Sequence, residues 1–381
     1  MKTKLKKTSV CLMFGGKSVE HDISILSGLQ VYHALDKNKY DITIVYITKG
    51  NKMLIGKDLS EIETYKKEKY VSKKYKKVYI DNVDRKAHLT SKRYKKQIDV
   101  FIPIVHGEGV EDGTISSILE FNNATYINAN LTSSAIAQDK AFTKDILKKY
   151  HINTPKYLCI ENSNNINQIV ENILTKLHLP VILKPIRLGS SIGIEKVSDE
   201  LNLVEKLKKT FEYSERIIVE EMVPNIKEYN CAAFKFNNKI YISSVEEVTT
   251  NSDYLTFFDK YINSKTKEDT SSSRIIPANI SEKLEEQIKT TTKNIYQILD
   301  MNGVIRIDYI YNVEKDKLYF NEVNTIPGSL SFYLFEDVGI KFNILLDMLI
   351  KEALLIKNNK EKKIKTFNSN VLNSKTTKLK K

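Results

Sequence analysis

The sequence contains no tryptophan and only three cysteines among its 381 residues. Cys11, Cys159 and Cys231 are odd in number, far apart and set in apolar runs. This pattern disfavours a disulfide framework and a cysteine-based metal site. It predicts buried free thiols in a reducing compartment.

Long apolar runs are also lacking. After the basic N-terminus the apolar run is only Val10 to Phe14, which is too short for the core of a signal peptide. No apolar stretch approaches the roughly 20 residues that are needed to span a bilayer. We therefore expect a cytoplasmic protein with no membrane partner.

The net charge is +13, but the lysines are spread along the chain. They concentrate at residues 2–7, at residues 66–96 and after residue 357. Aromatic residues are interleaved with basic ones only weakly, at Tyr65 to Tyr79, and no recognisable nucleic-acid-binding motif is present. We interpret the charge as favouring solubility and attracting anionic substrates such as nucleotides, and we expect no nucleic-acid partner.

The chain is 41% hydrophobic and 28% charged, enough for a large core and for two or three domains. Strands at Ser9 to Phe14 and Ile42 to Ile47 flank a helix from His21 to Leu35, which predicts a parallel sheet with crossover helices. We also expect a strand at Ile98 to Val105. Further elements are predicted as a variable excursion at 49–97, a strand at 125–128, one helix at 133–150 and a last helix at 341–356.

The most informative segment is a predicted hairpin spanning residues 306–324. If its turn centres on Lys315, Asp308 faces Glu322 and Arg306 faces Asn324, with all four side chains on one face of the sheet. Directly opposed carboxylates about 5 Å apart are destabilising unless a cation lies between them. Oxygen ligands of this kind suit Mg²⁺. An exposed charged hairpin is the alternative that this segment alone leaves open.

Four other segments favour a ligand only weakly when each is taken alone. Lys184 closes a buried strand before the small-residue loop 188–193, whose spacing is not that of a P-loop. Acids at 220–221 and 228 follow another strand. Gly15 to His21 forms a turn between a strand and a helix, where α/β sheets bind ligands. The loop 106–114 contains His106, for which structural hydrogen bonds are a better interpretation than zinc binding.

Taken in order, these segments strongly resemble the D-alanine–D-alanine ligase family of the ATP-grasp superfamily. The resemblance is carried by five motifs between Ser9 and Ile356: Gly-Gly-Lys-Ser-Val-Glu-His-Asp-Ile-Ser, His-Gly-x-x-x-Glu-Asp-Gly-Thr, Lys-Pro-x-x-x-Gly-Ser-Ser-x-Gly, Arg-Ile-Asp and Asn-Glu-Val-Asn-Thr-x-Pro-Gly.

The resemblance implies an α/β fold with a parallel-sheet, Rossmann-like domain at 1–128. A two-lobed ATP-grasp part with antiparallel sheets would follow at 129–224 and 225–357, and a basic disordered tail at 358–381. It also implies a homodimer, ATP and two Mg²⁺ (or Mn²⁺) as cofactors, and a role in peptidoglycan precursor and cell-wall synthesis.

The same resemblance implies roles for individual residues. Metal ligands would be Asp308, Glu322 and Asn324. The first D-alanine would be oriented by Glu20, Ser190 and Tyr261, and the oxyanion would be stabilised by Arg306 and Gly328. ATP would be bound by Lys140, Lys184, Glu220, Glu221, Val223, Glu228 and Lys260. The segment 251–273 would act as a lid that carries Lys260 and Tyr261.

The chemistry implied is attack of a D-alanine carboxylate on ATP to give D-alanyl phosphate, followed by attack of a second amine. The run Ser329 to Phe335 departs from the family pattern, as do the residues around Ile226 and Ser116. The alternatives are therefore a ligase with another acceptor, such as D-serine, and a catalytically silent paralogue. Retention of the oxyanion residue and the metal ligands argues against the silent paralogue: Arg306, Asp308, Glu322 and Asn324.

Overall fold

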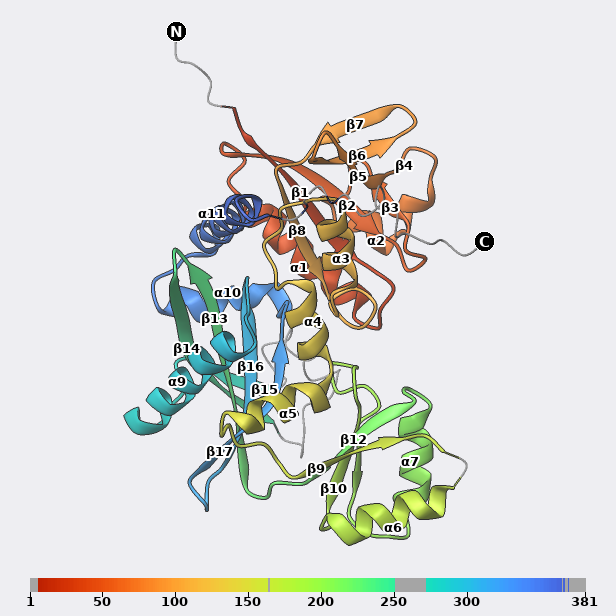
Figure 1. Cartoon of the computed structure of the whole chain (residues 1–381), viewed down its shortest axis with the longest axis vertical. Coiled ribbons are helices and arrows are strands. Elements are labelled where there is room, and N and C mark those ends of the chain that lie inside the picture. Colours follow the sequence, from red (N-terminus) through yellow and green to blue (C-terminus); the bar gives the residue numbers. More distant parts are fainter. Residues whose placement is uncertain (1–5, 164, 251–271, 365, 367–368, 370–381) are drawn as a thin grey trace.

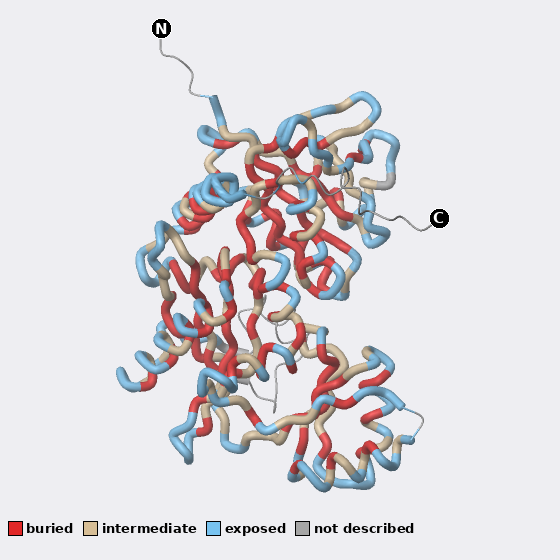
Figure 2. Tube along the Cα trace, viewed as in Figure 1, coloured by how far each residue is buried: buried red, intermediate tan, exposed pale blue. Residues whose placement is uncertain are grey.

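The computed structural model describes residues 6–163, 165–250, 272–364, 366 and 369, and these residues contain four β-sheets with helices packed on them (Figure 1). Figure 2 shows that the buried residues follow the strands and the inner faces of the helices. In this described part no helix is both long and apolar enough to cross a membrane.

The N-terminal sheet is centred on β1 (Thr8–Gly15), which pairs in parallel with β2 (Tyr40–Ile47) and β8 (Val100–Val105). Helix α1 (His21–Ala34) makes the crossover between the first two strands. The predicted parallel sheet is therefore confirmed. Its apolar strands are buried because α/β sheets are covered on both faces.

The excursion at 49–97 extends this sheet and adds a second one. Short strands β3 (Met53–Ile55) and β4 (Lys76–Lys77) continue the first sheet with antiparallel pairing. A separate three-stranded sheet follows in the chain. The other elements before the second domain are α2 (Glu63–Lys66), η1 (Lys69–Val71), β5 (Tyr79–Val83), β6 (Lys86–Ser91), β7 (Tyr94–Gln97) and α3 (Thr114–Phe121).

A four-stranded antiparallel sheet forms the central unit, in the order β11-β10-β12-β9. Its apolar side chains pack against two helices in one cluster. Its elements are β9 (Tyr157–Glu161), α6 (Ile166–Lys176), β10 (Val181–Pro185), β11 (Glu195–Val197), α7 (Leu203–Phe211) and β12 (Arg216–Glu221). The preceding helices α4 (Leu131–Gln138) and α5 (Lys140–Lys149) instead bury Ala137 and Leu147 in the core of the next sheet.

A five-stranded antiparallel sheet forms the next unit, in the order β15-β14-β13-β16-β17. Helix α9 (Glu282–Ile298) packs on it, and the side chain of Ser281 caps that helix by accepting from the N–H of Leu284. The strands are β13 (Ile226–Phe236), β14 (Lys239–Thr250), β15 (Ser272–Ile275), β16 (Ile305–Asn312) and β17 (Lys317–Asn324).

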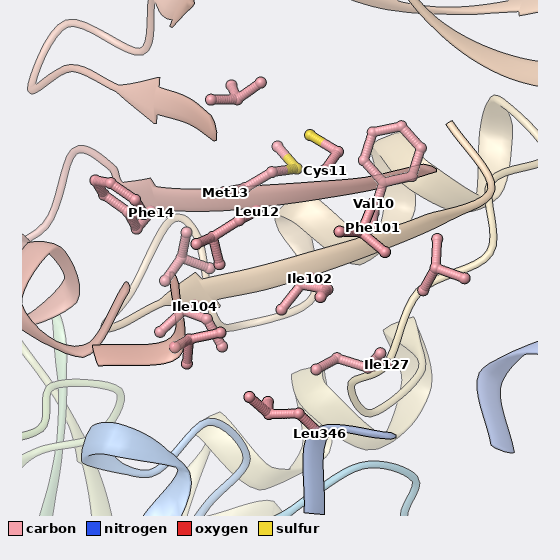
Figure 3. Close-up of a cluster of buried hydrophobic side chains, with 14 of the residues drawn as sticks. Val10, Cys11, Leu12, Met13, Phe14, Phe101, Ile102, Ile104, Ile127 and Leu346 are labelled. Atoms are coloured by element: carbon pink, nitrogen blue, oxygen red, sulfur yellow. The ribbon is translucent and has the colours of Figure 1, made fainter. Parts of the chain in front are cut away.

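The last helices return to the first sheet. After η3 (Gly328–Ser331) and α10 (Phe332–Asp337), α11 (Phe342–Glu361) lies beside the N-terminal unit in Figure 1. Leu346 of α11 belongs to the same buried cluster as Leu12 and Ile102, as Figure 3 shows. The C-terminal end of the described chain therefore stabilises the first domain.

Three predicted elements differ from the structure. The single helix expected at 133–150 is two helices, because Asp139 leaves the helical conformation and its carboxylate caps α5 by accepting from the N–H of Phe142. The strand expected at 125–128 is only an isolated bridge between Phe101 and Tyr126. Helix α11 continues to Glu361, so residues 358–361, which we assigned to the basic tail, are helical.

Candidate functional site

A cavity of about 470 Å³ lies where the N-terminal, central and C-terminal units meet. It is lined by residues that are far apart in the sequence but chemically related to the predicted site. Among the lining residues are Glu20, Lys140, Lys184, Gly189, Ser190, Glu228, Arg274, Arg306, Asp308, Asn321, Glu322, Asn324, Gly328 and Tyr333.

The hairpin of β16 and β17 has the predicted pairing at its functional end. Asp308 lies opposite Glu322, and Arg306 lies opposite Asn324. The turn is not centred on Lys315, however, because Asn312 pairs with Lys317 near the turn. A bulge after Asp308 shifts the register by one residue and restores the expected pairs.

This bulge adds a polar residue to the site. In a regular strand Asn321 and Glu322 would point to opposite faces, but both line the cavity. The Nζ of Lys184 donates to Oδ1 of Asn321 at 3.0 Å. Two adjacent polar residues in an otherwise alternating strand are the sequence signal that we missed.

Cations neutralise the facing carboxylates. Arg306 donates from Nε and Nη2 to the two carboxylate oxygens of Asp308, at 2.7 and 2.8 Å. The Nζ of Lys140 lies 3.7 Å from Oε2 of Glu322. Burial would lower the pKa of Arg306, but the charge of Asp308 and the hydrogen bonds to it, together with nearby Tyr333 and Glu246, outweigh burial and raise this pKa well above its usual value. Arg306 therefore stays charged in this cavity.

Four polar residues on neighbouring strands form a row across the C-terminal sheet at Asp308, which we call the polar row. Glu246 pairs with Asn230, Asn230 with Asp308, and Asp308 with Glu322, so the four residues share one face of neighbouring strands. The Nδ2 of Asn230 donates to Oε2 of Glu246 at 2.9 Å. The row explains why the face is polar although the sheet's other face is part of a core.

The donor set fits a hard cation. Two carboxylates and the amide of Asn324 offer oxygen ligands on one face, and Asn324 already contacts Asp308 through Nδ2 at 3.3 Å. No cluster of three or more His, Cys, Asp or Glu residues that could hold a metal is found in the described part of the chain. A Mg²⁺ ion here would take its other ligands from water and phosphate, as this ion commonly does.

A buried ion-pair network supports the phosphate side of the cavity. The carboxylate of Glu220 accepts from Nζ of Lys184 at 2.7 Å and lies 2.9 Å from Nζ of Lys144. Burial would raise the pKa of Glu220, but the two lysines outweigh it and lower this pKa to about 2. Glu220 is therefore an anion that fixes the position of Lys184.

The end of the cavity that contains Glu20 is built by loops of the first two units. The buried carboxylate of Glu20 accepts a hydrogen bond from the hydroxyl of Ser190. Ser190 and Ser191 have φ values of 53° and 58°, a left-handed conformation that costs about 1–2 kcal/mol per residue. The loop thus holds Ser190 in a strained conformation that presents its side chain to Glu20.

His106 and Glu111 connect the first unit to the loop before Gly328. His106 is buried, its Nε2 lies 3.2 Å from the hydroxyl oxygen of Ser27, and burial lowers its pKa to about 4. Glu111 accepts from the N–H of Gly107 at 3.0 Å and from the N–H of Ile326 at 2.8 Å. Glu111 therefore bridges two units of the chain beside the cavity.

The pKa of Glu111 predicts that the stability of the protein depends on pH. Burial, together with the charge of Glu20, raises the pKa of Glu111 from 4.5 to about 7. The folded state then binds more protons than the unfolded state between these values, so stability falls as pH rises. A pKa shift of this size would lower the free energy of unfolding by about 3 kcal/mol at high pH. We expect a loss of about 2 kcal/mol, because Glu111 is only half-buried and solvent screens its charge.

Urea unfolding of the wild type and of Glu111→Gln at pH 5 and pH 8 measures this effect. The wild type should lose stability relative to the variant at the higher pH. An equal pH dependence of the two proteins would contradict the prediction.

Most of the predicted residues that the structure describes meet at the cavity. Glu20, Ser190, Lys140, Lys184, Glu228, Arg306, Gly328 and the three metal-ligand candidates line it, and Glu220 lies behind Lys184. Glu221 and Val223 are not among the described residues that line the cavity, and Glu221 instead contacts His178 and Lys156. Lys260, Tyr261 and positions 251–271 of the predicted lid lie outside the described residues.

Four contributors to the site were not predicted from the sequence: Lys144, Arg274, Asn321 and Glu111. Lys144 is fully buried one helical turn after Lys140, and burial lowers its pKa. A lysine at this spacing would face the same side of a helix as Lys140. Arg274 follows the predicted lid in the sequence, and no local pattern distinguishes it.

Comparison with known proteins gives a consistent result. The family model "D-ala D-ala ligase N-terminus" matches residues 9–129, and "D-ala D-ala ligase C-terminus" matches residues 146–351. The D-alanine--D-alanine ligase of Thermosipho melanesiensis is 37% identical over 372 residues, covering 97% of this chain and 99% of the relative. That of Caldicellulosiruptor bescii is 36% identical, covering 94% and 98%.

The solved structure of the VanG D-Ala:D-Ser ligase from Enterococcus faecalis is also similar. It has a TM-score of 0.80 and 27% sequence identity, and the match covers 91% of this chain and 100% of that one.

Proposed function

The chain belongs to the D-alanine–D-alanine ligase family, and we propose from its cavity how it joins two D-alanine molecules at the expense of ATP. The two sequence relatives, at 37% and 36% identity, are named for D-alanine as both substrates, whereas the D-Ala:D-Ser ligase structure is only 27% identical, so the D-serine alternative is not favoured. The observation that carries the proposal is the meeting of Glu20, Lys184, Arg306 and the Asp308–Glu322 pair at one cavity.

Phosphoryl transfer is the first step. The carboxylate oxygen of the first D-alanine attacks the γ-phosphorus of ATP, the bond to the β-phosphate oxygen breaks, and D-alanyl phosphate and ADP form. Lys140 and Lys184 line the cavity and supply positive charge for the phosphates. The buried Glu220 fixes Lys184, so the charge is held in place before ATP binds.

Metal binding would assist this step. Asp308, Glu322 and Asn324 would hold Mg²⁺ or Mn²⁺, and the family implies two ions. When bound, the metal neutralises charge on the transferring phosphoryl group. Within the protein, Arg306 and Lys140 keep the facing carboxylates together before the metal arrives.

Substrate orientation is assigned to the strained loop and the first helix. The buried carboxylate of Glu20, with the hydroxyl of Ser190, would receive the ammonium group of the first D-alanine. Tyr261 and Lys260 remain candidates for closing the site from the segment 251–273. Glu228 would bind the ribose, and the chain around Glu221 and Val223 would bind the adenine.

Peptide-bond formation is the second step. The neutral amine of the second D-alanine attacks the acyl carbon and forms the C–N bond and the oxyanion. The oxyanion then collapses, the C–O bond to phosphate breaks, and phosphate leaves while the nitrogen releases one proton. The bonds to Asp308 use Nε and one N–H of Nη2 of Arg306, so the two N–H groups of Nη1 and the second of Nη2 are the donors that we assign to the oxyanion. A Cβ added at Gly328 would meet no atom within 4 Å, so the protein itself leaves space at the second proposed donor.

We further propose that the enzyme acts in the cytoplasm as a homodimer and supplies dipeptide for peptidoglycan precursors. The three-part division at 128 and 224 would separate donor binding, nucleotide binding, and metal and acceptor binding. Light scattering after size exclusion would test the dimer, and a monomer at working concentration would contradict it.

Incubation with ATP, Mg²⁺ and D-alanine tests the function. We expect ADP and D-alanyl-D-alanine in equal amounts, because each peptide bond consumes one acyl phosphate. D-serine supplied with D-alanine is the control for acceptor choice. A mixed dipeptide in excess over D-alanyl-D-alanine would contradict the assignment of the acceptor, and ADP release without any dipeptide would contradict ligation.

A further inference from the structure

Arg274 is a cation on the cavity wall that has no role in the two steps of the proposed reaction. It lies on β15, and its side chain is 48% exposed. Its Cζ lies 5.4 Å from the centroid of the Tyr333 ring, and its Nε lies 3.5 Å from Oε1 of Glu246. The ring and the carboxylate therefore hold the guanidinium at the cavity.

The groups that hold Arg274 are themselves fixed. Glu246 is almost fully buried, accepts from Asn230, and lies 3.3 Å from the hydroxyl of Tyr333. Among the described residues, Arg274 has the ion pair and the ring contact but no hydrogen bond. Its planar fork of N–H donors, which suits a carboxylate, is therefore open to a ligand at the cavity.

Resting on the proposed ligase function, we propose that Arg274, held in place by the Tyr333 ring and Glu246, binds the carboxylate of the acceptor amino acid and so selects an acceptor with a free carboxylate. The acceptor amine must reach the acyl carbon beside Arg306 and Gly328. Its carboxylate is only two bonds from that amine, so it must lie within a few ångströms of the same place.

The negative charges around the acceptor carboxylate would repel it unless a cation lies beside it. It does not react, so it keeps a full negative charge, and the polar row places Glu246, Asp308 and Glu322 on the same face of the sheet. Arg306, the other cation near Tyr333, is bound through two N–H groups to Asp308, so Arg274 is the better placed to offer a compensating charge. Burial raises the pKa of Tyr333 to about 12, so the phenol stays protonated and donates its single O–H to Oε2 of Glu246, which keeps its ring beside Arg274.

Tyr333 also accounts for part of the unusual sequence after Gly328. Ser329, Leu330 and Ser331 all have positive φ values, between 47° and 53°. This left-handed turn docks on α1, where the N–H of Ser329 donates to the hydroxyl of Ser27 at 3.1 Å. Helix α10 begins directly after the turn, and Tyr333 on it lines the cavity.

Competition between D-alanine and D-alaninamide tests the inference. D-alaninamide has no carboxylate to phosphorylate, so it can act only as acceptor, and both products arise from the same D-alanyl phosphate. The ratio of D-alanyl-D-alanine to D-alanyl-D-alaninamide, measured by mass spectrometry, therefore reports acceptor choice independently of the ATP and donor sites.

We expect the wild type to favour D-alanine and Arg274→Gln to lower the product ratio by about ten- to a hundred-fold, because a charged hydrogen-bonding partner of the carboxylate is lost. Arg274→Lys should fall between the two, and Tyr333→Phe should shift the ratio in the same direction. Lys239→Gln is the matched control, since Lys239 also stacks on a tyrosine, Tyr241, at 5.0 Å but does not line the cavity.

An unchanged product ratio in Arg274→Gln would overturn the inference whatever happens to the total rate. An equal loss of both products would assign Arg274 only to neutralising Glu246, and a raised KM for ATP with an unchanged ratio would assign it to the nucleotide. If Arg274→Gln does not fold, Arg274→Lys keeps the charge beside Glu246 and carries the test. A wild type that makes no dipeptide would instead contradict the proposed function.

Discussion

Glu322→Gln is expected to lower kcat by roughly 10³-fold or more, because metal neutralisation of the transferring phosphoryl group is worth several kcal/mol. The substitution keeps the size of the side chain but removes the charge that faces Asp308 across the hairpin. The Nζ of Lys140 lies 3.7 Å from Oε2 of Glu322, which is a long distance for an ion pair. The free energy of unfolding should therefore change by only about 0.5 kcal/mol.

Release of ADP and formation of dipeptide over a range of Mg²⁺ concentrations measure this effect. The variant should need more Mg²⁺ than the wild type to reach its own maximal rate. Glu314→Gln is the matched control, because Glu314 lies in the exposed turn of the same hairpin. Activity like that of the wild type in Glu322→Gln would remove Glu322 from the metal site.

Glu220→Gln should destabilise the protein by about 3–5 kcal/mol, the usual cost of removing one partner from a buried ion pair. Lys144 and Lys184 would remain buried beside an amide that cannot neutralise them. Lys184 would also lose the contact that positions it, so the KM for ATP should rise. Urea unfolding and steady-state kinetics measure the two effects.

Two further variants isolate the cause. Glu221→Gln changes the neighbouring residue, whose partners are largely exposed, and should cost less than about 1 kcal/mol. Adding Lys144→Met to Glu220→Gln removes one of the unpaired charges and should recover part of the lost stability. A Glu220→Gln protein as stable as the wild type would show that the network does not stabilise the fold.

The pH dependence of the free energy of unfolding provides a second test of the role of Glu220. Because its folded pKa is lowered to about 2, its ionisation stabilises the fold above the ordinary value of 4.5, and this contribution is lost as pH falls through about 2. The stability difference between the wild type and Glu220→Gln should therefore be constant near neutral pH and shrink in strong acid.

The central pairs of the candidate site followed from the sequence. Strand side chains alternate with period two, so the spacing of Arg306, Asp308, Glu322 and Asn324 predicts one shared face, and the structure confirms the predicted opposition of Asp308 and Glu322. The alternation could not reveal the bulge that brings Asn321 to the same face. A bulge depends on how the strand fits its neighbours, not on the local pattern.

The resemblance identified the cavity residues that belong to recurring motifs, but not the residues that support them. Lys144 and Glu111 act through contacts with segments more than 70 residues away in the chain, at Glu220 and Ile326. Such contacts exist only after the units have assembled. The break at Asp139 was missed for a related reason, since a capping aspartate is visible in the sequence but the change of helix direction is not.

The sequence by itself determined the family, the parallel sheet of the first unit, and the residue types of the metal and phosphate sites, because these rest on short-range periodicity and motif order. Tertiary structure decided which charges neutralise one another, where α11 packs, and which side chains line the cavity. These depend on the distance between segments that the chain order does not fix. Arg274 shows the difference: the sequence offers one arginine among many cations, and only the fold brings it to Tyr333 and Glu246 at the cavity.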